Sequence, residues 1–294
     1  MARQPHAAKE GEGTPVVSKA VAADFPGRFR EIISDPLNLL IARVPLAGFV
    51  HGNEVFLHNV NRVAIAGPYA YYDKFSDILI LNRGVHEPIE EYVFQEVMRQ
   101  MPQAPVMVEL GAYWGHYSMW LCKLRPNATA ILVEPNSHNL AVGRHNFQRN
   151  GFTGEFINAS VGANNFEVDS FLQSRGIAHL DVLHADIQGH EVEMLVGSRQ
   201  SLERATIDYL FISTHSQPLH NKVIEELGRF GYRIEAASDF EHDTTSYDGF
   251  VFASSPRAKR VFEKLVFLGR TGIVQSAPRE LVDSLLAVNS SRST

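Results

Sequence analysis

The stretch VMVELGAYWGHYSMWLCKLRPNATAILVEPN, residues 106–136, decides the fold. It holds short apolar runs at residues 106–110 and 130–135, and the segment between them has apolar residues at helical spacing. This alternation of apolar run and amphipathic segment continues to residue 231. It is typical of a parallel sheet whose two faces are both covered by helices. We therefore predict a doubly wound α/β fold of the Rossmann type with a mainly parallel sheet.

Outward from this stretch, the remaining elements follow the same rule. The predicted core strands are 106–110, 130–135, 155–162, 180–186 and 207–214, and the predicted helices are 116–124, 138–150, 169–176, 190–202 and 220–231. Two further apolar runs, 232–238 and 249–254, read as a closing antiparallel hairpin. After them we expect helices at 259–270 and 280–288, and a frayed end at 289–294.

The residues before the sheet form a different region. Residues 1–23 are rich in small, charged and turn residues and predict a flexible tail. Residues 24–104 predict a lead-in subdomain on the substrate side, with strands at 50–60 and 77–82 and a helix at 88–101. The domain that binds the cofactor is then 105–255, followed by a C-terminal segment, 256–294.

Composition narrows the class of function. The chain has 294 residues, of which 45% are hydrophobic and 20% charged, as in soluble globular proteins. Its 27 basic and 33 acidic residues give a net charge of −6, which argues against a nucleic-acid partner. The single cysteine, Cys122, excludes an internal disulfide and a cysteine-based zinc cluster. We see neither a membrane span nor a signal peptide, expect a cytoplasmic protein and leave a homodimer open.

The loop after the first core strand points to a cofactor. Gly111 permits a tight turn and close backbone approach, and Gly115 lets the next helix begin near the strand. A dinucleotide needs glycine at the second position of its fingerprint, where this chain has Tyr113. A cofactor that ends in an amino acid does not require this glycine. Glu109 can pair with its ammonium group, while the helix N-terminus binds its carboxylate. S-adenosylmethionine fits this description. The alternative is that the glycine loop only reverses the chain direction and binds no cofactor.

The next strand ends with a second acid. Glu134 follows Glu109 by 25 residues, close to the ~20-residue offset at which an acid binds ribose hydroxyls. Taken alone, Glu134 could equally be a helix cap. We also expect contacts to the cofactor from residues near these two acids and at the end of a later strand: Tyr113, Tyr117, Asn136, Asp186 and Ser160, with Ser160 at the adenine.

The residues GVHEPIEEYVF, VELGAYWGHYS, VEPN, NASVG, VDSFL, LDVLHADIQGHEVEMLVG and a late histidine, in this order, resemble the FkbM family of S-adenosylmethionine-dependent methyltransferases. The resemblance covers about residues 84–254. It implies that Glu109, Gly111, Gly115 and Glu134 hold the cofactor, and that Asp186, Glu191 and His215 border the reaction site. The family commonly methylates hydroxyl groups, often on sugars. Two positions depart from its pattern: His184 replaces a usual lysine, and Ser213 a frequent acid.

Two routes to acceptor activation stay open. His215 could accept the hydroxyl proton directly, with Asp186 or Glu191 orienting it. Alternatively, a divalent cation such as Mg²⁺, held by Asp186 and His215 and extended by Glu191 or Asp248, could lower the pKa of the acceptor hydroxyl. Each of these residues also has a structural reading, Asp186 as a helix cap and His215 as a buried structural histidine. The pairs His242–Asp243 and Tyr247–Asp248, on the loop before residue 249, could reach the same edge of the sheet, but we interpret this loop as a polar surface loop.

Aromatic residues complete the predicted site. Tyr69, Tyr71 and Tyr72 form a cluster that suits a sugar ring, although a buried core explains them equally well. Trp114 could cover the cofactor or acceptor, and Trp120 is expected in the core. The sequence therefore predicts an O-methyltransferase acting on a saccharide or small metabolite. A nicotinamide-dependent oxidoreductase and a non-catalytic adenosyl-binding protein are the alternatives.

Overall fold

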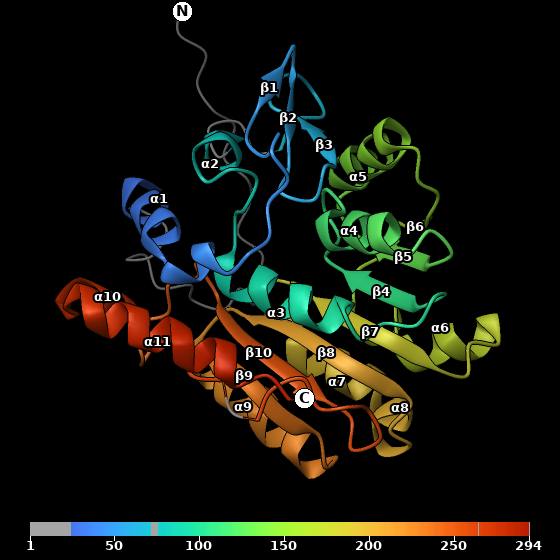
Figure 1. The fold of residues 1–294 in the computed structure, drawn as a ribbon. Coiled ribbons are helices and arrows are strands. Elements are labelled where there is room, and N and C mark those ends of the chain that lie inside the picture. Colours follow the sequence, from blue (N-terminus) through green and yellow to red (C-terminus); the bar gives the residue numbers. More distant parts are fainter. Residues whose placement is uncertain (1–24, 72–75, 264, 294) are drawn as a thin grey trace, which may run out of the picture.

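A computed structural model describes residues 25–71, 76–263 and 265–293 of the chain (Figure 1). The predicted tail at 1–23 and Tyr72 of the aromatic cluster lie outside these residues. The subdivision at residues 104 and 255 stays a prediction.

A seven-stranded sheet forms the centre of the molecule, in the order β6-β5-β4-β7-β8-β10-β9 (Figure 1). The five strands from β6 to β8 are parallel, and β10 is antiparallel to both of its neighbours. The strands are β4 (Val106–Leu110), β5 (Thr129–Val133), β6 (Glu155–Ile157), β7 (Leu180–Ala185), β8 (Ile207–Thr214), β9 (Arg233–Ser238) and β10 (Gly249–Ser254). This confirms the predicted doubly wound α/β fold and the closing antiparallel hairpin.

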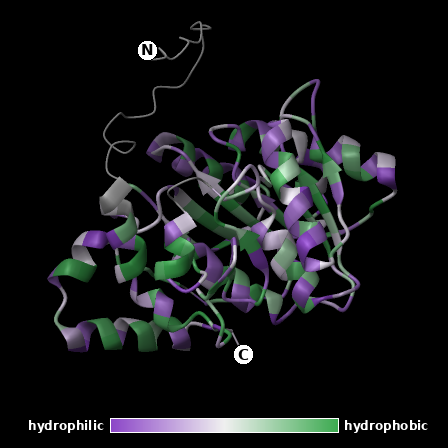
Figure 2. Ribbon diagram, turned by 90° about the horizontal axis from the view of Figure 1, so that it is seen from above, coloured by the Kyte–Doolittle hydropathy of each residue, from purple (hydrophilic) through white to green (hydrophobic). Residues whose placement is uncertain are grey.

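Helices cover both faces of this sheet. Met107 of β4 packs on the face that carries α3, α4 and α11, while the next residue, Val108, packs on the face that carries α6, α7, α8 and α9. In Figure 2 these helices carry both hydrophobic and hydrophilic residues, as expected when one side of a helix is buried. The helices are α3 (Pro88–Met98), α4 (His116–Leu124), α5 (Ser137–Asn150), α6 (Val168–Arg175), α7 (Glu191–Gly197), α8 (Arg199–Glu203), α9 (Gln217–Arg229), α10 (Arg270–Gln275) and α11 (Pro278–Ser290).

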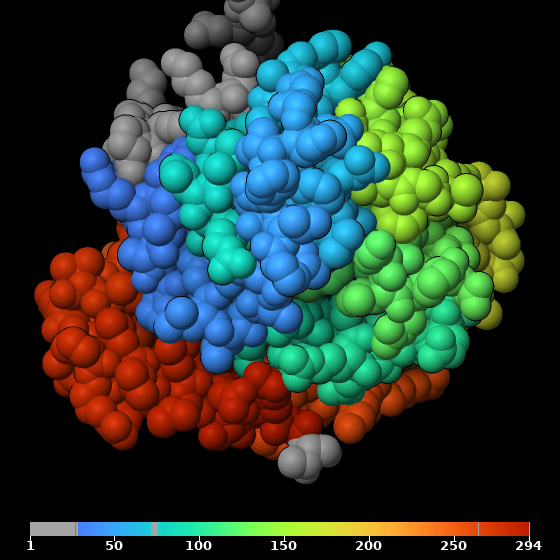
Figure 3. Space-filling model, turned by 45° about the horizontal axis from the view of Figure 1, so that its top comes forward, coloured from blue at the N-terminus to red at the C-terminus, as the bar shows by residue number. Residues whose placement is uncertain are grey.

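The lead-in region forms a small antiparallel sheet beside the large one. Its elements are α1 (Phe25–Ser34), η1 (Pro36–Leu39), β1 (Val50–His51), β2 (Glu54–Phe56), β3 (Arg62–Ala64) and α2 (Ser76–Leu81). Figure 3 shows the small sheet against α5, and the Asn150 side chain joins the two parts by accepting the Arg62 N–H at 2.8 Å. The predicted strand at 77–82 is wrong, because this run is α2. Helix and strand are hard to separate in so short an apolar run.

The segment predicted as a helix at 259–270 is also different. Of its described residues, 259–263 and 265–270, only Arg270 is helical, as the first residue of α10. Glu235 of β9 accepts the backbone N–H groups of Val261 and Phe262 at 2.8 Å each, so these groups are used outside any helix. The predicted helix at 280–288 is confirmed as α11. The Ser293 N–H donates to the Val261 carbonyl at 2.8 Å, and the frayed end stays a prediction.

Among the described residues, no helix is both long and apolar enough to cross a membrane.

Candidate active site

The strand order reverses between β4 and β7, and a cavity lies at that point. From β4 the chain winds outward to β6 and then returns to β7 on the other side of β4. In open α/β sheets, ligands bind beyond the carboxyl ends of the strands at such a switch point. The cavity has a volume of about 550 Å³. The predicted site residues that line it are Glu109, Gly111, Tyr113, Tyr117, Glu134, Ser160 and Asp186.

Gly111 is required by the chain itself. Its φ is +72°, and a Cβ built there would lie 1.7 Å from the carbonyl oxygen of Asp186. Gly115 also has a positive φ, of 73°, as the N-cap of α4, and a Cβ there would meet Leu132 and Phe147 at 3.0 Å. Gly115 does not line the cavity. Both glycines therefore shape the loop, and only Gly111 lies at the cavity wall.

Two buried carboxylates lie at the ends of β4 and β5. Glu134 accepts the Asn136 N–H at 2.8 Å and the Tyr113 N–H at 3.3 Å, which fixes its orientation. Glu109 accepts the Ser118 N–H at 3.0 Å. Burial raises the pKa of each of these carboxyl groups. Asn136 caps α5, accepting the His138 N–H at 2.9 Å, and is not in the cavity wall.

His215 lies among three carboxylates, two of which, Asp186 and Asp248, line the cavity, while His215 and Glu191 themselves are not in its wall. Its Nδ1 is 2.7 Å from Glu191 Oε1, and its Nε2 is 3.2 Å from Asp186 Oδ1 and 3.7 Å from Asp248 Oδ1. Nε2 is buried and makes no hydrogen bond to any described residue. Burial lowers the pKa of His215, but the three carboxylates outweigh it and raise the value to about 11. Asp186, Glu191 and His215, separate in sequence, therefore meet in one cluster.

The methyltransferase FkbM domain matches residues 87–234, half of the chain. The chain belongs to the FkbM methyltransferase family. It is therefore a methyltransferase that takes its methyl group from S-adenosylmethionine, as the motifs predicted. This assignment decides against the nicotinamide oxidoreductase.

Solved structures similar to this methyltransferase are distant relatives. TrmK of M. capricolum, with S-adenosyl-homocysteine, has 12% identity and a TM-score of 0.42 over 67% of this chain and 94% of its own. Ribosomal protein L11 methylase from Lactobacillus delbrueckii subsp. bulgaricus has 15% identity and a TM-score of 0.41, over 59% and 81%. The METTL16 methyltransferase domain has 11% identity and a TM-score of 0.46, over 80% and 90%. No curated protein matches the chain.

The methyltransferase cavity also holds acids that the sequence analysis missed. Glu90 of α3 accepts the Ser213 hydroxyl at 3.0 Å and pairs with His184. His184 and Ser213 are the two residues that depart from the family pattern. Both contact the same buried carboxylate, that of Glu90. Glu87, nearby, accepts the Tyr117 hydroxyl at 3.1 Å. The acid pair in PIEEY was the signal in the sequence, but helical spacing alone did not show that Glu90 faces the sheet.

The aromatic residues divide between the cavity and the core. Tyr71 and Trp114 line the cavity, with ring centroids 4.5 Å apart. Tyr69 is outside the cavity wall and stacks on His145 at 3.6 Å. Trp120 is buried in the core, as expected.

Residues of the loop before β10 also divide. Tyr247 and Asp248 line the cavity, so the interpretation of this part of the loop as polar surface was wrong. His242 instead pairs with Asp239 at 2.7 Å, and the Asp243 carbonyl accepts the Arg270 N–H at 2.7 Å, so both lie in surface contacts.

Proposed function

We propose that this methyltransferase transfers the methyl group to a hydroxyl of a saccharide or glycosylated metabolite, and that the Asp186–His215 cluster activates the acceptor oxygen. The observation that carries the proposal is the arrangement of His215 among Asp186, Glu191 and Asp248 at the edge of the cavity. In the reaction, the acceptor oxygen bonds to the methyl carbon while the carbon–sulfur bond breaks and sulfur keeps the electron pair. The acceptor hydroxyl must also lose its proton, and the proposed role of the Asp186–His215 cluster is to promote this loss.

Cofactor binding is assigned to the acids of β4 and β5. Glu134, oriented by two backbone N–H groups, suits the ribose hydroxyls. Glu109 suits the ammonium group of the cofactor, because a buried carboxylate gains from a neighbouring cation. Tyr113 and Ser160 line the same cavity wall as Glu134 and are assigned to the adenosyl part.

The donor set of the cluster fits a divalent cation such as Mg²⁺. Glu191 holds His215 Nδ1, which leaves Nε2 between Asp186 and Asp248. A carboxylate behind a histidine that faces further carboxylates is a common arrangement at metal sites. A bound cation would lower the pKa of the acceptor hydroxyl. The proton would leave to solvent past Asp186, since 35% of that side chain is exposed.

The direct-base route has less support. With a pKa of about 11, His215 is protonated at neutral pH and has no free lone pair on its ring. A cation between the carboxylates would replace that proton on Nε2. We therefore favour the route through a divalent cation.

The charge of the cavity favours a neutral acceptor. Among the described residues that line it there are six acids and neither lysine nor arginine: Glu87, Glu90, Glu109, Glu134, Asp186 and Asp248. Acids accept hydrogen bonds from sugar hydroxyls and repel phosphate and carboxylate groups. Tyr71 and Trp114 provide aromatic faces for the C–H surface of a sugar ring.

The test is transfer of a labelled methyl group from S-adenosylmethionine to a panel of neutral, amino and anionic saccharides and their glycosides. We expect transfer to neutral or amino members and none to phosphorylated or uronic members. Base-stable label would indicate an ether, as an O-methyl sugar requires. Transfer only to anionic members, or only to carboxylates as base-labile esters, would contradict the proposed acceptor class.

A further inference from the structure

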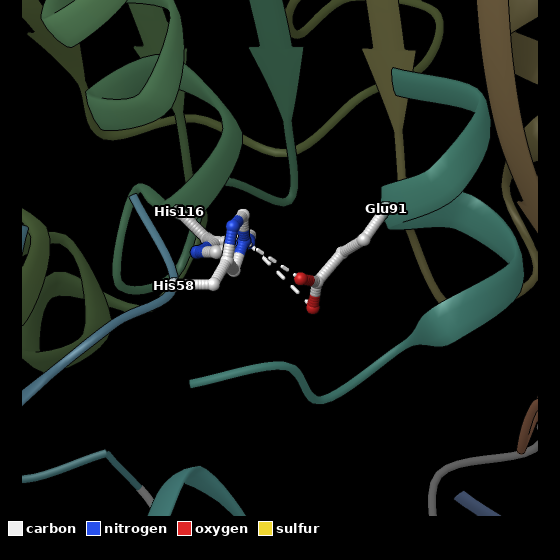
Figure 4. Close-up of side chains that lie close together, drawn as sticks. All are labelled: His58, Glu91 and His116. Atoms are coloured by element: carbon white, nitrogen blue, oxygen red, sulfur yellow. Dashed lines mark ion pairs between the residues drawn. The ribbon is translucent and has the colours of Figure 1, made fainter. Parts of the chain in front are cut away.

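A second polar cluster lies between the lead-in region and α4, and one of its members, His116, also lines the cofactor cavity. His58 follows β2, Glu91 lies in the first turn of α3, and His116 begins α4. Their side chains are 1%, 0% and 1% exposed, respectively. Figure 4 shows the two imidazole rings on one side and the Glu91 carboxylate facing them from α3. Residues distant in sequence thus place two rings and one acid in a dry interior.

The distances within this cluster are those of ligands around a common centre. His58 Nε2 lies 2.8 Å from Glu91 Oε2, and His116 Nε2 lies 3.7 Å from Glu91 Oε1. One donor atom from each residue lies within 4.8 Å of the other two. In a tetrahedral zinc site, bonds of ~2.0–2.1 Å place the ligand atoms ~3.3 Å apart. Small side-chain movements are enough to reach that geometry.

Hydrogen bonds do not account for these atoms. His58 Nε2, Glu91 Oε2 and both ring nitrogens of His116 are buried and make no hydrogen bond to any described residue. Buried polar atoms without partners are rare, because each loses its hydration without compensation. Among the described residues, no lysine or arginine forms an ion pair with Glu91. Its ion-pair partners are imidazoles, those of His58, His86 and His116.

The other carboxylate oxygen is already engaged. Glu91 Oε1 accepts the backbone N–H groups of His86 and Glu87 at 2.8 and 3.1 Å, and His86 Nδ1 lies 2.6 Å away. These contacts hold the carboxylate so that Oε2 faces His58.

We propose that His58 Nε2, Glu91 Oε2 and His116 Nε2 bind one divalent transition-metal ion, with Zn²⁺ the best match. Two imidazoles and one carboxylate with a fourth position open are a donor set that protein zinc sites use. Cys122, the single cysteine, is not among the ligands.

Such an ion would fix the cofactor loop. It joins the lead-in region, α3 and the start of α4, directly after the loop at residues 111–115. Trp114 stacks on His116, with centroids 4.7 Å apart and planes at 16°, and lines the cofactor cavity. The proposed role is to hold Trp114 and the start of α4 in place. This inference does not depend on the acceptor or on the cation proposed at Asp186.

The test is the metal content of full-length protein purified without chelator, measured by elemental analysis. The background carries Asp186→Asn, so that the reaction site does not contribute. We expect one equivalent of Zn²⁺ per chain, removal by a strong chelator with a fall in melting temperature, and recovery of both on adding Zn²⁺. His58→Ala and Glu91→Gln should each weaken Zn²⁺ binding at least ~10-fold.

His179→Ala is the matched control. His179 lies near Asp181 and Asp208 in another histidine–carboxylate group, but at the surface, and its loss should leave the Zn²⁺ content unchanged. If the cluster variants do not fold, Co²⁺ added to the parent protein should give the visible absorption of a four-coordinate site. The proposal is overturned if the parent protein binds no Zn²⁺ or Co²⁺ and its melting temperature ignores chelator, or if the cluster variants keep full Zn²⁺ content.

Discussion

Gly111 lies where the loop after β4 passes the backbone of β7, and its role is clearest at the scale of the single residue. Gly111→Ala would place a Cβ 1.7 Å from the Asp186 carbonyl oxygen, and backbone atoms cannot move aside easily. Gly151 has the same φ of +72° and nothing within 4 Å of its Cβ position. Gly151→Ala should therefore cost only the left-handed strain, ~1–2 kcal/mol.

We expect Gly111→Ala to lower the free energy of unfolding by at least ~3 kcal/mol, or to prevent folding. Urea unfolding of the two variants beside the parent measures the difference. Equal losses in both would mean that the close approach of β4 and β7 is not as tight as the structure has it.

Glu134 is the residue on which the cofactor assignment depends most. Replacing its carboxylate by an amide in Glu134→Gln removes a charge-assisted bond to the ribose, which costs ~1.5–3 kcal/mol, or roughly 10–100-fold in affinity. Calorimetric titration with S-adenosylhomocysteine measures this loss. Glu155→Gln, on β6 and outside the cavity wall, is the control and should bind like the parent. Unchanged affinity in a folded Glu134→Gln protein would remove the ribose assignment.

At the scale of the element, Asp35 joins η1 to the loop before β10. It caps η1 by accepting the Leu37 N–H at 2.8 Å, and it accepts the Thr245 hydroxyl. Burial raises the pKa of Asp35 from 3.8 to about 6, although both hydrogen bonds lower it. Because the folded-state pKa is raised, the protonated acid favours folding. Its contribution is complete below about pH 4 and is lost as pH rises through about 6.

The Asp35→Asn substitution keeps the shape of the side chain and removes the titratable carboxyl group. The variant should equal the parent at pH 4 and exceed it by ~3 kcal/mol in free energy of unfolding above pH 7, from about two pKa units. Urea unfolding across that range measures the difference, with Asp283→Asn, a side chain 54% exposed, as control. A difference that does not vary with pH would show that Asp35 is already ionised throughout.

The two misassigned elements, residues 77–82 and 259–270, share one cause. Both are apolar runs whose state depends on contacts distant in sequence. In α2, Ile78 and Leu79 are buried while Leu81 is exposed, so one face packs as a helix does. The segment after residue 259 has helical spacing, but Glu235 of β9 binds its N–H groups. Local pattern contains no information on such a partner.

At the scale of the whole molecule, the sheet could be predicted because each strand run is followed by its own helix. The residues at the strand ends, Glu109, Glu134 and Asp186, followed from that order. The acids of α3 did not, because Glu90 and Glu91 differ by one position yet face different partners: His184 in the cavity and His58 in the interior. Only the packing of α3 between the sheet and the lead-in region decides which way each points.

The central claim is that a divalent cation at Asp186, His215 and Asp248 activates the acceptor. The measurement is the rate of methyl transfer to the best acceptor of the panel after chelator treatment, and again after Mg²⁺ or Mn²⁺ is added to protein reloaded with Zn²⁺. The account predicts loss of turnover with chelator, recovery only with Mg²⁺ or Mn²⁺, and no recovery in Asp186→Asn or His215→Ala. Full turnover in excess chelator, or in both variants, would contradict it.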